Sequence, residues 1–339
     1  MNDAIASSAA WKENRDAGPE LRATSACPSC DEPRAIALLT SSDRLYATTT
    51  REFDVVQCAG CGLIRLDPFP EPYELELYYP RQYWFSAKGG SLASRLEEEY
   101  RRFVLGDHVR FVKRALDESE ETGPVLDVGC GGGLFLRMLG ERGHPGIGLD
   151  FSVDAATVAW KQNGVPVVCA TLDKAPLQSN SFAAITMVHV LEPLYDPPAY
   201  LTAAHELLRP DGRLILQVPN AACWQFLVFG KDWNGVDVPR HLFNFKQADL
   251  DGLLNSCGFE VLRHKHFSLR DNPAGFATSV APGLDPMARR IRQVEEGPKT
   301  RILKDAAYFG LVLAALPFTV LEAACGAGST IMIEARKRK

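Results

Sequence analysis

The sequence has no excess of basic residues. It contains 37 lysine and arginine residues against 42 aspartate and glutamate residues, so its formal net charge is −5 over 339 residues. Proteins that bind nucleic acid present a basic footprint, which is missing here at the level of the whole chain. We therefore do not expect nucleic acid to be the main partner, although a local basic patch for RNA stays compatible with the sequence.

A targeting segment and a disulfide framework are also missing. Residues 1–20 carry mixed charges and contain no apolar core of signal-peptide length. The nine cysteines are odd in number and scattered along the chain, unlike the paired cysteines of small secreted proteins. We expect residues 1–22 to form a flexible N-terminus and the protein to be cytoplasmic.

Long hydrophobic runs are rare, with one exception near the C-terminal end. Residues 308–325, YFGLVLAALPFTVLEAAC, form an apolar stretch of about 18 residues, the lower limit for a helix that spans a membrane. Pro317 and Glu322 interrupt it. A buried or lid helix is the leading interpretation. The alternatives are peripheral membrane contact through residues 306–325, which would make the protein membrane-associated, and a true span.

Strand and helix patterns alternate from residue 125 onwards. Helical stretches such as 152–163 and 197–208 separate apolar runs, and residues 91–120 repeat apolar side chains at three- and four-residue steps, as a helix does. This alternation predicts an α/β fold, in which helices cover both faces of a parallel sheet. The predicted strands are 125–128, 146–149, 165–169, 182–190, 213–218, 259–267 and 330–335.

The segment between the last two predicted strands, residues 268–328, is too long for a simple turn. We interpret it as an insertion or lid that contains the apolar helix. Its first half, RDNPAGFATSVAPGLDPMARR, is rich in proline and glycine and is expected to be irregular.

A glycine-rich loop follows the first predicted strand in the stretch VLDVGCGGGLFL, residues 125–136. Glycines allow a tight turn and a close approach of the backbone to a ligand. Dinucleotide-binding loops are similar, but their fingerprint needs a small residue where Leu134 stands. The loop alone is therefore a weak signal, and the residues around it must decide the ligand.

Two acids flank this loop. Asp127 precedes it, where a carboxylate suits a cationic ligand and is unfavourable beside a pyrophosphate. Asp150 ends the second predicted strand, where an acid can accept hydrogen bonds from both hydroxyls of a ribose. Together they indicate a cationic ligand that contains a nucleoside.

In combination, these motifs resemble the class I S-adenosylmethionine-dependent methyltransferases, in the type 11/23-like branch with an HVLEH-type fourth strand. The resemblance covers about residues 120–265, and the last strand more loosely. It implies a Rossmann-like, seven-stranded, mostly parallel sheet with an antiparallel last strand, formed by residues 91–267 and 329–339. The motifs that carry it are LDVGCGGG, GLD, TLDKAPLQSNSFAAITMVHVLEPLYDP, LLRPDGRLILQVPN and CGFEV.

The resemblance also implies S-adenosylmethionine as the cofactor and a role for each motif. The glycines line its methionine part, the acid before them orients its amino group, and the acid after the second strand binds its ribose. Residues after the third strand flank the adenine, and a histidine after the fourth strand closes over the cofactor. Structural alternatives are a helix cap for Asp127, a turn for Asp150 and packing at the sheet edge for His189. The implied cofactor-binding positions are Asp127, Gly129, Cys130, Gly131, Gly133, Asp150, Phe151, Thr171, Leu172 and His189.

The chain departs from the family in its fourth-strand motif, because Pro193 stands where HVLEH has its second histidine. A catalytic base must then come from elsewhere. The segment WNGVDVPRHLFNF, residues 233–245, resembles the loop that faces the methyl group in this family. We predict His241 as the general base, with Asp237 and Arg240 orienting it or binding an anionic substrate. The alternative is a histidine that pins the next helix.

Four cysteines precede the methyltransferase-like region. Cys27 and Cys30 form one Cys-x-x-Cys pair, and Cys58 and Cys61 form a second. Two such pairs predict a tetrahedral thiolate site for structural zinc, and four thiolates leave no open position for catalysis. A redox pair and chance spacing are the alternatives. We expect the zinc to organise a small zinc-ribbon domain, residues 23–85, with too little core of its own.

A ribbon of this kind resembles one found before the catalytic domain in methyltransferases of bacterial polysaccharide and natural-product pathways. The aromatic residues after it are expected to cover the mouth of the active site or to pack the domain junction. They are Tyr78, Tyr79, Tyr83 and Trp84.

We therefore predict O-methylation of a sugar, a polysaccharide precursor or a small secondary metabolite, in free or lipid-linked form. One alternative is an interaction protein that binds S-adenosylmethionine without turnover, and another is an RNA methyltransferase with the zinc ribbon as an RNA clamp.

Overall fold

The computed structural model describes residues 21–79, 92–119 and 121–338. The N-terminal residues 1–20, together with Tyr83 and Trp84, lie outside the described residues.

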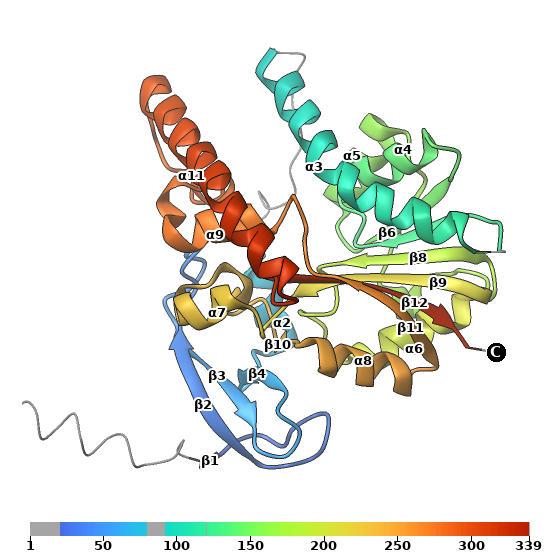
Figure 1. Ribbon diagram of the computed structural model, residues 1–339, viewed down its shortest axis with the longest axis horizontal. Coiled ribbons are helices and arrows are strands. Elements are labelled where there is room, and N and C mark those ends of the chain that lie inside the picture. Colours follow the sequence, from blue (N-terminus) through green and yellow to red (C-terminus); the bar gives the residue numbers. More distant parts are fainter. Residues whose placement is uncertain (1–20, 80–91, 120, 339) are drawn as a thin grey trace, which may run out of the picture.

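A central seven-stranded sheet forms the body of the protein (Figure 1). Its strand order is β11-β12-β9-β8-β5-β6-β7, and β12 runs antiparallel to both of its neighbours while the other pairs are parallel. The predicted fold class is therefore confirmed, including the antiparallel last strand. The strands are β5 Val125–Val128, β6 Gly146–Asp150, β7 Val167–Cys169, β8 Phe182–Val188, β9 Leu208–Pro219, β11 Phe259–Lys265 and β12 Thr330–Lys337.

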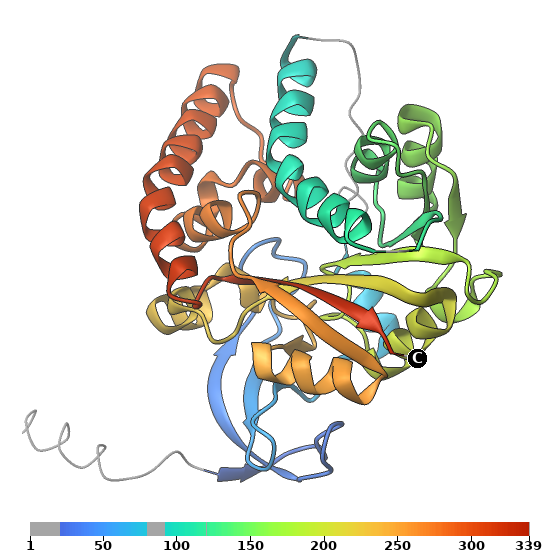
Figure 2. The ribbon, with the colours of Figure 1, turned by 45° about the vertical axis from the view of Figure 1, so that its right-hand side comes forward.

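The middle strands are apolar on both sides because helices cover both faces of the sheet. Every residue of β5 is buried, and so is β8 up to its last residue. Figures 1 and 2 show one group of helices on one face and another group on the opposite face. The first group is α3 Leu92–Asp117, α4 Leu134–Gly140 and α5 Val153–Asn163, and the second is α6 Pro197–Leu207 and α8 Gln247–Ser256.

A second, five-stranded antiparallel sheet carries the cysteine pairs. Its last strand, β10, comes from the methyltransferase-like region and pairs with β4. The buried residues of the two regions also form one hydrophobic cluster, in which Phe53 and Leu66 join Leu242 and Phe243. The sheet is thus completed by chain far beyond residue 85. Its strands are β1 Leu21–Ala23, β2 Arg34–Ser41, β3 Phe53–Cys58, β4 Ile64–Asp67 and β10 Phe243–Asn244. A short helix, α2 Pro72–Leu77, follows β4.

The insertion between β11 and β12 is helical, so the expectation of an irregular first half is wrong. Each of its helices begins at or beside a proline, whose fixed φ suits the first turn of a helix. The Asp285 carboxylate also accepts hydrogen bonds from the backbone N–H groups of Met287 and Ala288 and so caps the second helix. The helices are α9 Asn272–Val280, α10 Pro286–Ile291 and α11 Pro298–Ala324.

The long helix α11 contains the apolar stretch and stands at the edge of the molecule (Figures 1 and 2). Among the described residues it is the single helix long and apolar enough to cross a membrane. Only 22% of its most apolar 18-residue window is buried, so the interpretation as a buried helix is wrong. Its N-terminal half contacts α3 through the rings of Tyr100 and Phe309, whose centroids are 6.3 Å apart.

Candidate functional site

The glycine loop lies between β5 and α4, at the carboxyl edge of the sheet. Gly129 and Gly131 have φ angles of +72° and +51°, a region that side chains disfavour. A Cβ atom at Gly129 would lie 2.9 Å from Val190 Cγ2, whereas one at Gly131 would meet nothing within 4 Å. The loop thus packs against the end of β8 at Gly129 and is open at Gly131, as a backbone that receives a ligand must be.

Asp127 is a buried acid at this edge. It is 5% exposed, and its Oδ1 accepts a hydrogen bond of 2.5 Å from Thr186 Oγ1 on the neighbouring strand β8. Burial, together with the negative charge of Asp150, raises the pKa of Asp127 to about 7. A buried carboxylate in this position favours a cationic partner, because such a partner restores its ionised form.

Asp150 ends β6 and is bound by the backbone around it. Its Oδ2 accepts from Gly131 N at 2.9 Å and its Oδ1 from Ser152 N at 2.9 Å. Burial raises the pKa of Asp150 despite these two hydrogen bonds. Since each carboxylate oxygen has a further lone pair, the group can also accept hydrogen bonds from two hydroxyls of a ligand.

The remaining predicted cofactor positions surround these acids. Phe151 follows Asp150 with its ring 58% exposed. Leu172 is buried after β7, and the Oγ1 atom of Thr171 beside it is buried without a hydrogen-bond partner among the described residues. An orphaned hydroxyl at this point fits a polar ligand. Cys130 is buried and packs its sulfur against Gly148, so its backbone alone belongs to the loop.

His189 follows β8 with a positive φ of 56° and is held by polar side chains from three other positions. Its Nδ1 lies 3.1 Å from Glu192 Oε1, and its Nε2 lies 3.1 Å from the Gln217 amide nitrogen and 3.7 Å from Asp271 Oδ1. The Gln217 amide also donates to Asp271 Oδ2 at 2.8 Å. These contacts fix the position of the His189 ring at the edge of the sheet.

The charge of His189 is expected to make stability depend on pH. Burial lowers its pKa, but the hydrogen bonds and charges of Asp271 and Glu192 more than offset this and raise the pKa to about 9. The folded pKa exceeds that of an unfolded histidine, about 6.5. The stabilising contribution is thus complete below pH 6.5 and is lost as the pH rises through 9.

Denaturant unfolding of the wild type and of His189→Gln at pH 6 to 10 checks this expectation. The wild type should have the larger free energy of unfolding at pH 6, and its advantage over His189→Gln should become smaller as the pH rises to 10. Deprotonated Nε2 can accept the Gln217 N–H, so the ion pair with Asp271 is exchanged for one hydrogen bond. A difference that stays constant from pH 6 to 10 would contradict the assignment.

The predicted base, His241, lies in the loop before β10. Its Nδ1 lies 3.0 Å from the Gly235 carbonyl oxygen, and its Nε2 lies 3.8 Å from Asp237 Oδ2. The next two backbone N–H groups, those of Leu242 and Phe243, donate to the carbonyl oxygen of Glu192. The loop of His241 and the loop of His189 are therefore in direct contact.

Arg240 is a buried residue whose guanidinium is bound by protein groups. Its side chain is 1% exposed, and its guanidinium binds Asp43 through two hydrogen bonds of 2.9 Å each and Asp237 through Nε and Nη2. Nη1 also donates to the carbonyl oxygen of Tyr78. Arg240 thus joins the cysteine-bearing sheet to the loop of His241, and all three of its nitrogens are occupied by protein oxygens.

Several site residues were missed by the sequence analysis. Asp271, Gln217 and Asp43 received no role, and Glu192 was noted only as part of a motif. Asp271 follows β11 at the same carboxyl edge of the sheet, so a search for polar residues after every parallel strand would have found it. No comparable signal marks Asp43, whose partner Arg240 is 197 residues away in sequence.

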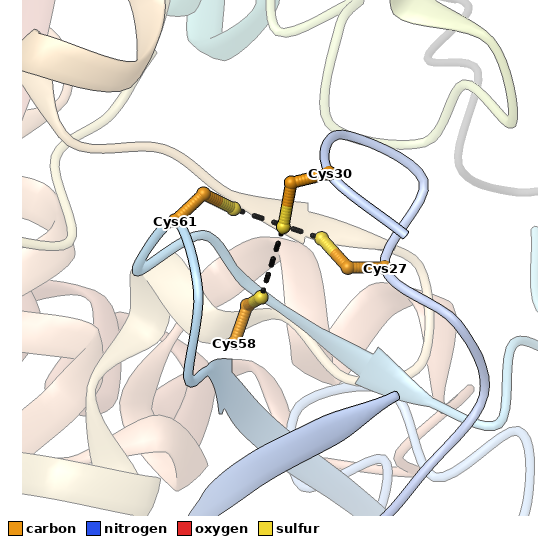
Figure 3. A group of neighbouring side chains, drawn as sticks. All are labelled: Cys27, Cys30, Cys58 and Cys61. Carbon is orange, nitrogen blue, oxygen red and sulfur yellow. Dashed lines mark hydrogen bonds between the residues drawn. The ribbon is translucent and has the colours of Figure 1, made fainter. Parts of the chain in front are cut away.

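The four cysteines converge as predicted (Figure 3). Their sulfur atoms all lie within 4.8 Å of one another, with Cys27 to Cys61 at 3.7 Å and Cys30 to Cys58 at 3.5 Å. Four sulfurs around a zinc ion at about 2.3 Å would be separated by about 3.8 Å. The donor set and its spacing therefore fit a tetrahedral metal site.

Comparison with known proteins gives a family for the larger region. Residues 96–264 match the family described as a methyltransferase domain. Among curated relatives, a ubiquinone biosynthesis O-methyltransferase of Xanthomonas axonopodis pv. citri is 32% identical over 149 residues, which are 40% of this chain and 62% of the relative. One from Citrobacter koseri is 28% identical over 171 residues, 48% of this chain and 71% of the relative. The chain thus spans less than two thirds of the length of the first of these.

Solved structures with similar folds are more distant in sequence. The 1,6-didemethyltoxoflavin-N1-methyltransferase of Burkholderia thailandensis is 16% identical, with a TM-score of 0.45, and the match covers 85% of this chain and 96% of that one. The magnesium protoporphyrin IX methyltransferase of Synechocystis is 14% identical, with a TM-score of 0.44 and coverage of 77% and 96%.

Proposed function

We propose that this protein, whose residues 96–264 belong to the methyltransferase domain family, transfers the methyl group of S-adenosylmethionine to a hydroxyl group of a small acceptor. The observation that carries the proposal is the pair of acids at adjacent strand ends. Asp127 on β5 and Asp150 on β6 flank a loop that is open at Gly131. One acid suits the ammonium group of the cofactor and the other its ribose, whereas a pyrophosphate at the loop would be repelled by Asp127.

When bound, S-adenosylmethionine supplies a methyl group on a sulfonium that is already activated for transfer. The chain must then hold the cofactor and the acceptor in line and accept the hydroxyl proton. We assign the methionine part to Asp127 and the glycine loop, the ribose to Asp150, and the adenine to Phe151, Thr171 and Leu172. His189 lies beside the loop through its neighbour Val190.

For proton transfer we propose Nε2 of His241. Its Nδ1 faces the Gly235 carbonyl, which accepts a hydrogen bond and so fixes the tautomer in which Nε2 carries the lone pair. Asp237 lies on the Nε2 side at 3.8 Å and can stabilise the imidazolium that forms. Arg240 acts on this pair through Asp237 rather than on a substrate.

We propose a sugar, a polysaccharide precursor or a small secondary metabolite as the acceptor, lipid-linked forms included. The names of the curated relatives support transfer to oxygen, since both are O-methyltransferases. We also propose zinc as a structural ion at the four cysteines, and a cytoplasmic protein that meets a membrane through residues 306–325.

Replacing the proposed base tests the function. His241→Gln is expected to lower kcat for a hydroxyl acceptor by about 10²- to 10⁴-fold, because the variant cannot accept the proton. Production of S-adenosylhomocysteine over a panel of acceptors measures turnover, and calorimetry with S-adenosylhomocysteine should give an unchanged Kd. His144→Gln, a histidine outside the site, serves as the matched control.

Two outcomes would redirect the proposal. A kcat within about twofold of the wild type would remove His241 from the proton transfer. Tight binding of S-adenosylhomocysteine without turnover by the wild type would instead favour a non-catalytic binding protein, the interpretation that Pro193 motivates.

A further inference from the structure

Helix α11 exposes apolar side chains on its outward face, whereas a helix on the surface of a water-soluble protein exposes polar ones. The large side chains on its outward face are apolar and between 49% and 71% exposed, and the other exposed positions between 302 and 324 are alanine, glycine or proline. Lys304 and Asp305 are partly exposed near the start of the helix, with side-chain exposures of 34% and 43%. From residue 306 to residue 324 no charged or hydrogen-bonding residue is exposed. The large residues are Ile302, Leu303, Leu313, Val320 and Leu321, together with Phe309, whose half-exposed ring also contacts Tyr100 of α3.

Polar residues of the same stretch have partners in the neighbouring helices. Glu322 is fully buried and accepts hydrogen bonds from the backbone and side-chain nitrogens of Gln225 in α7, Trp224–Phe229. The Tyr308 hydroxyl lies 2.9 Å from Thr278 Oγ1 in α9, and Asp305 pairs with Arg289 in α10. The polar side chains of α11 thus have partners in α7, α9 and α10, while its apolar side chains are exposed to solvent.

Such a face requires an apolar partner. Water-soluble monomers rarely expose continuous apolar patches of more than a few hundred Å². Twenty-three helical residues extend over about 35 Å, so the outward stripe of α11 is long. The neighbouring helix α7 adds Leu227 and Val228, which are 80% and 68% exposed. Single exposed apolar residues need no explanation, but this arrangement does.

The charge at one end of the stripe identifies the partner. Exposed basic residues gather in and before the first turn of α11, at Arg290, Arg292, Lys299 and Arg301, with Glu295 as the exposed acid among them. This excess of positive charge occurs in a chain whose net charge is −5. An apolar helical face with a basic flank is typical of binding to the surface of an anionic bilayer.

We propose that α11 docks the protein on an anionic lipid bilayer, with its outward face in the headgroup region. The helix lies on the membrane and does not cross it, because crossing would separate Glu322, Tyr308 and Asp305 from their partners in the body.

Docking also bears on the acceptor, and this step rests on the proposed methyl transfer. The helix packed under α11, α9, begins directly after Asp271, which contacts Gln217 and His189 at the carboxyl edge of the sheet. The lobe that meets the lipid is therefore continuous with the wall of the site. An acceptor held in the membrane by an apolar chain is the substrate class that this arrangement serves.

Vesicle co-sedimentation tests the docking without cofactor or turnover. The full chain should bind vesicles of phosphatidylcholine mixed with phosphatidylglycerol at least tenfold more tightly than vesicles of phosphatidylcholine alone, and added salt should weaken the binding. The variant Leu303→Gln, Leu313→Gln, Leu321→Gln should lose binding at least tenfold while its thermal unfolding stays close to that of the wild type. Leu77→Gln with Trp160→Gln, two exposed apolar residues away from α11, should bind as the wild type does.

Four other outcomes would contradict one or the other proposal. Absence of wild-type binding to either vesicle would overturn the docking, as would equal binding to both compositions. A dimer in light scattering that the triple variant dissociates, without vesicle binding, would show that a second copy of the chain covers the face. Failure of turnover with every acceptor, with vesicle binding intact, would concern the enzyme proposal alone.

Discussion

Removing Cys58, one of the four proposed zinc ligands, is expected to unfold the cysteine-bearing sheet. In Cys58→Ser the second pair, at the turn between β3 and β4, loses one of its thiolates, and zinc should be released on purification. Structural zinc contributes about 10–16 kcal/mol of apparent binding free energy in peptides that fold around it. This is comparable to the total stability of a domain, about 5–15 kcal/mol, so no other single change is expected to cost as much.

Metal analysis and hydrogen exchange check this expectation. The wild type should contain about one zinc per chain, and Cys58→Ser should show rapid amide exchange over residues 21–67. Because β10 pairs with β4, exchange should also rise at Phe243 and Asn244. Cys169→Ser, an exposed cysteine outside the cluster, is the matched control. A wild type without zinc that still protects this sheet would contradict the structural role of the metal.

Replacing Arg240 by methionine should give the second largest effect. Arg240→Met keeps the apolar stem of the side chain but leaves the carboxylates of Asp43 and Asp237 without their counter-charge. Burial raises the pKa of Asp43, yet the hydrogen bonds and charge of Arg240, with Thr48, lower it to about 2. Breaking a buried ion pair by removal of one partner costs about 3–5 kcal/mol.

Urea unfolding at pH 7 measures this cost. Arg336→Met is a matched control, because Arg336 pairs with Glu260 on the surface with side-chain exposures of 38% and 46%, and exposed pairs contribute at most about 1 kcal/mol. If Arg240→Met costs no more than Arg336→Met, the buried ion pair does not hold the two sheets together. Cofactor binding by the variant shows in addition whether the junction positions the loop of His241.

The parts of the fold that could be predicted are those encoded by local patterns. The strand order along the chain, the glycine loop and the spacing of the cysteine pairs depend on residues close together in sequence. The acids of β5 and β6 were found for the same reason, because each is one of the last two residues of its strand. The prolines of the insertion led to the wrong prediction of an irregular segment, since a proline that breaks one helix can begin the next.

The aromatic residues after the ribbon show the same limit. Tyr78 could cover the site or pack the junction, and the structure places it at the junction. It is 7% exposed, its ring meets Phe53 at a centroid distance of 6.0 Å, and its carbonyl accepts from Arg240. The sequence carried no information on this choice, because Phe53 and Arg240 come from other segments of the chain.

The sequence by itself determined the α/β class, the glycine loop with its two acids and the two cysteine pairs, because each is specified by the period or spacing of neighbouring residues. Only the tertiary structure decided that β10 completes the cysteine-bearing sheet, that Arg240 is bound by Asp43, and that Asp271 reaches His189. It also decided the direction of the apolar side of α11. A hydrophobic run has the same sequence pattern whether it faces a core or a membrane. Only the contacts of Tyr308, Asp305 and Glu322 show which side of the helix packs against the protein.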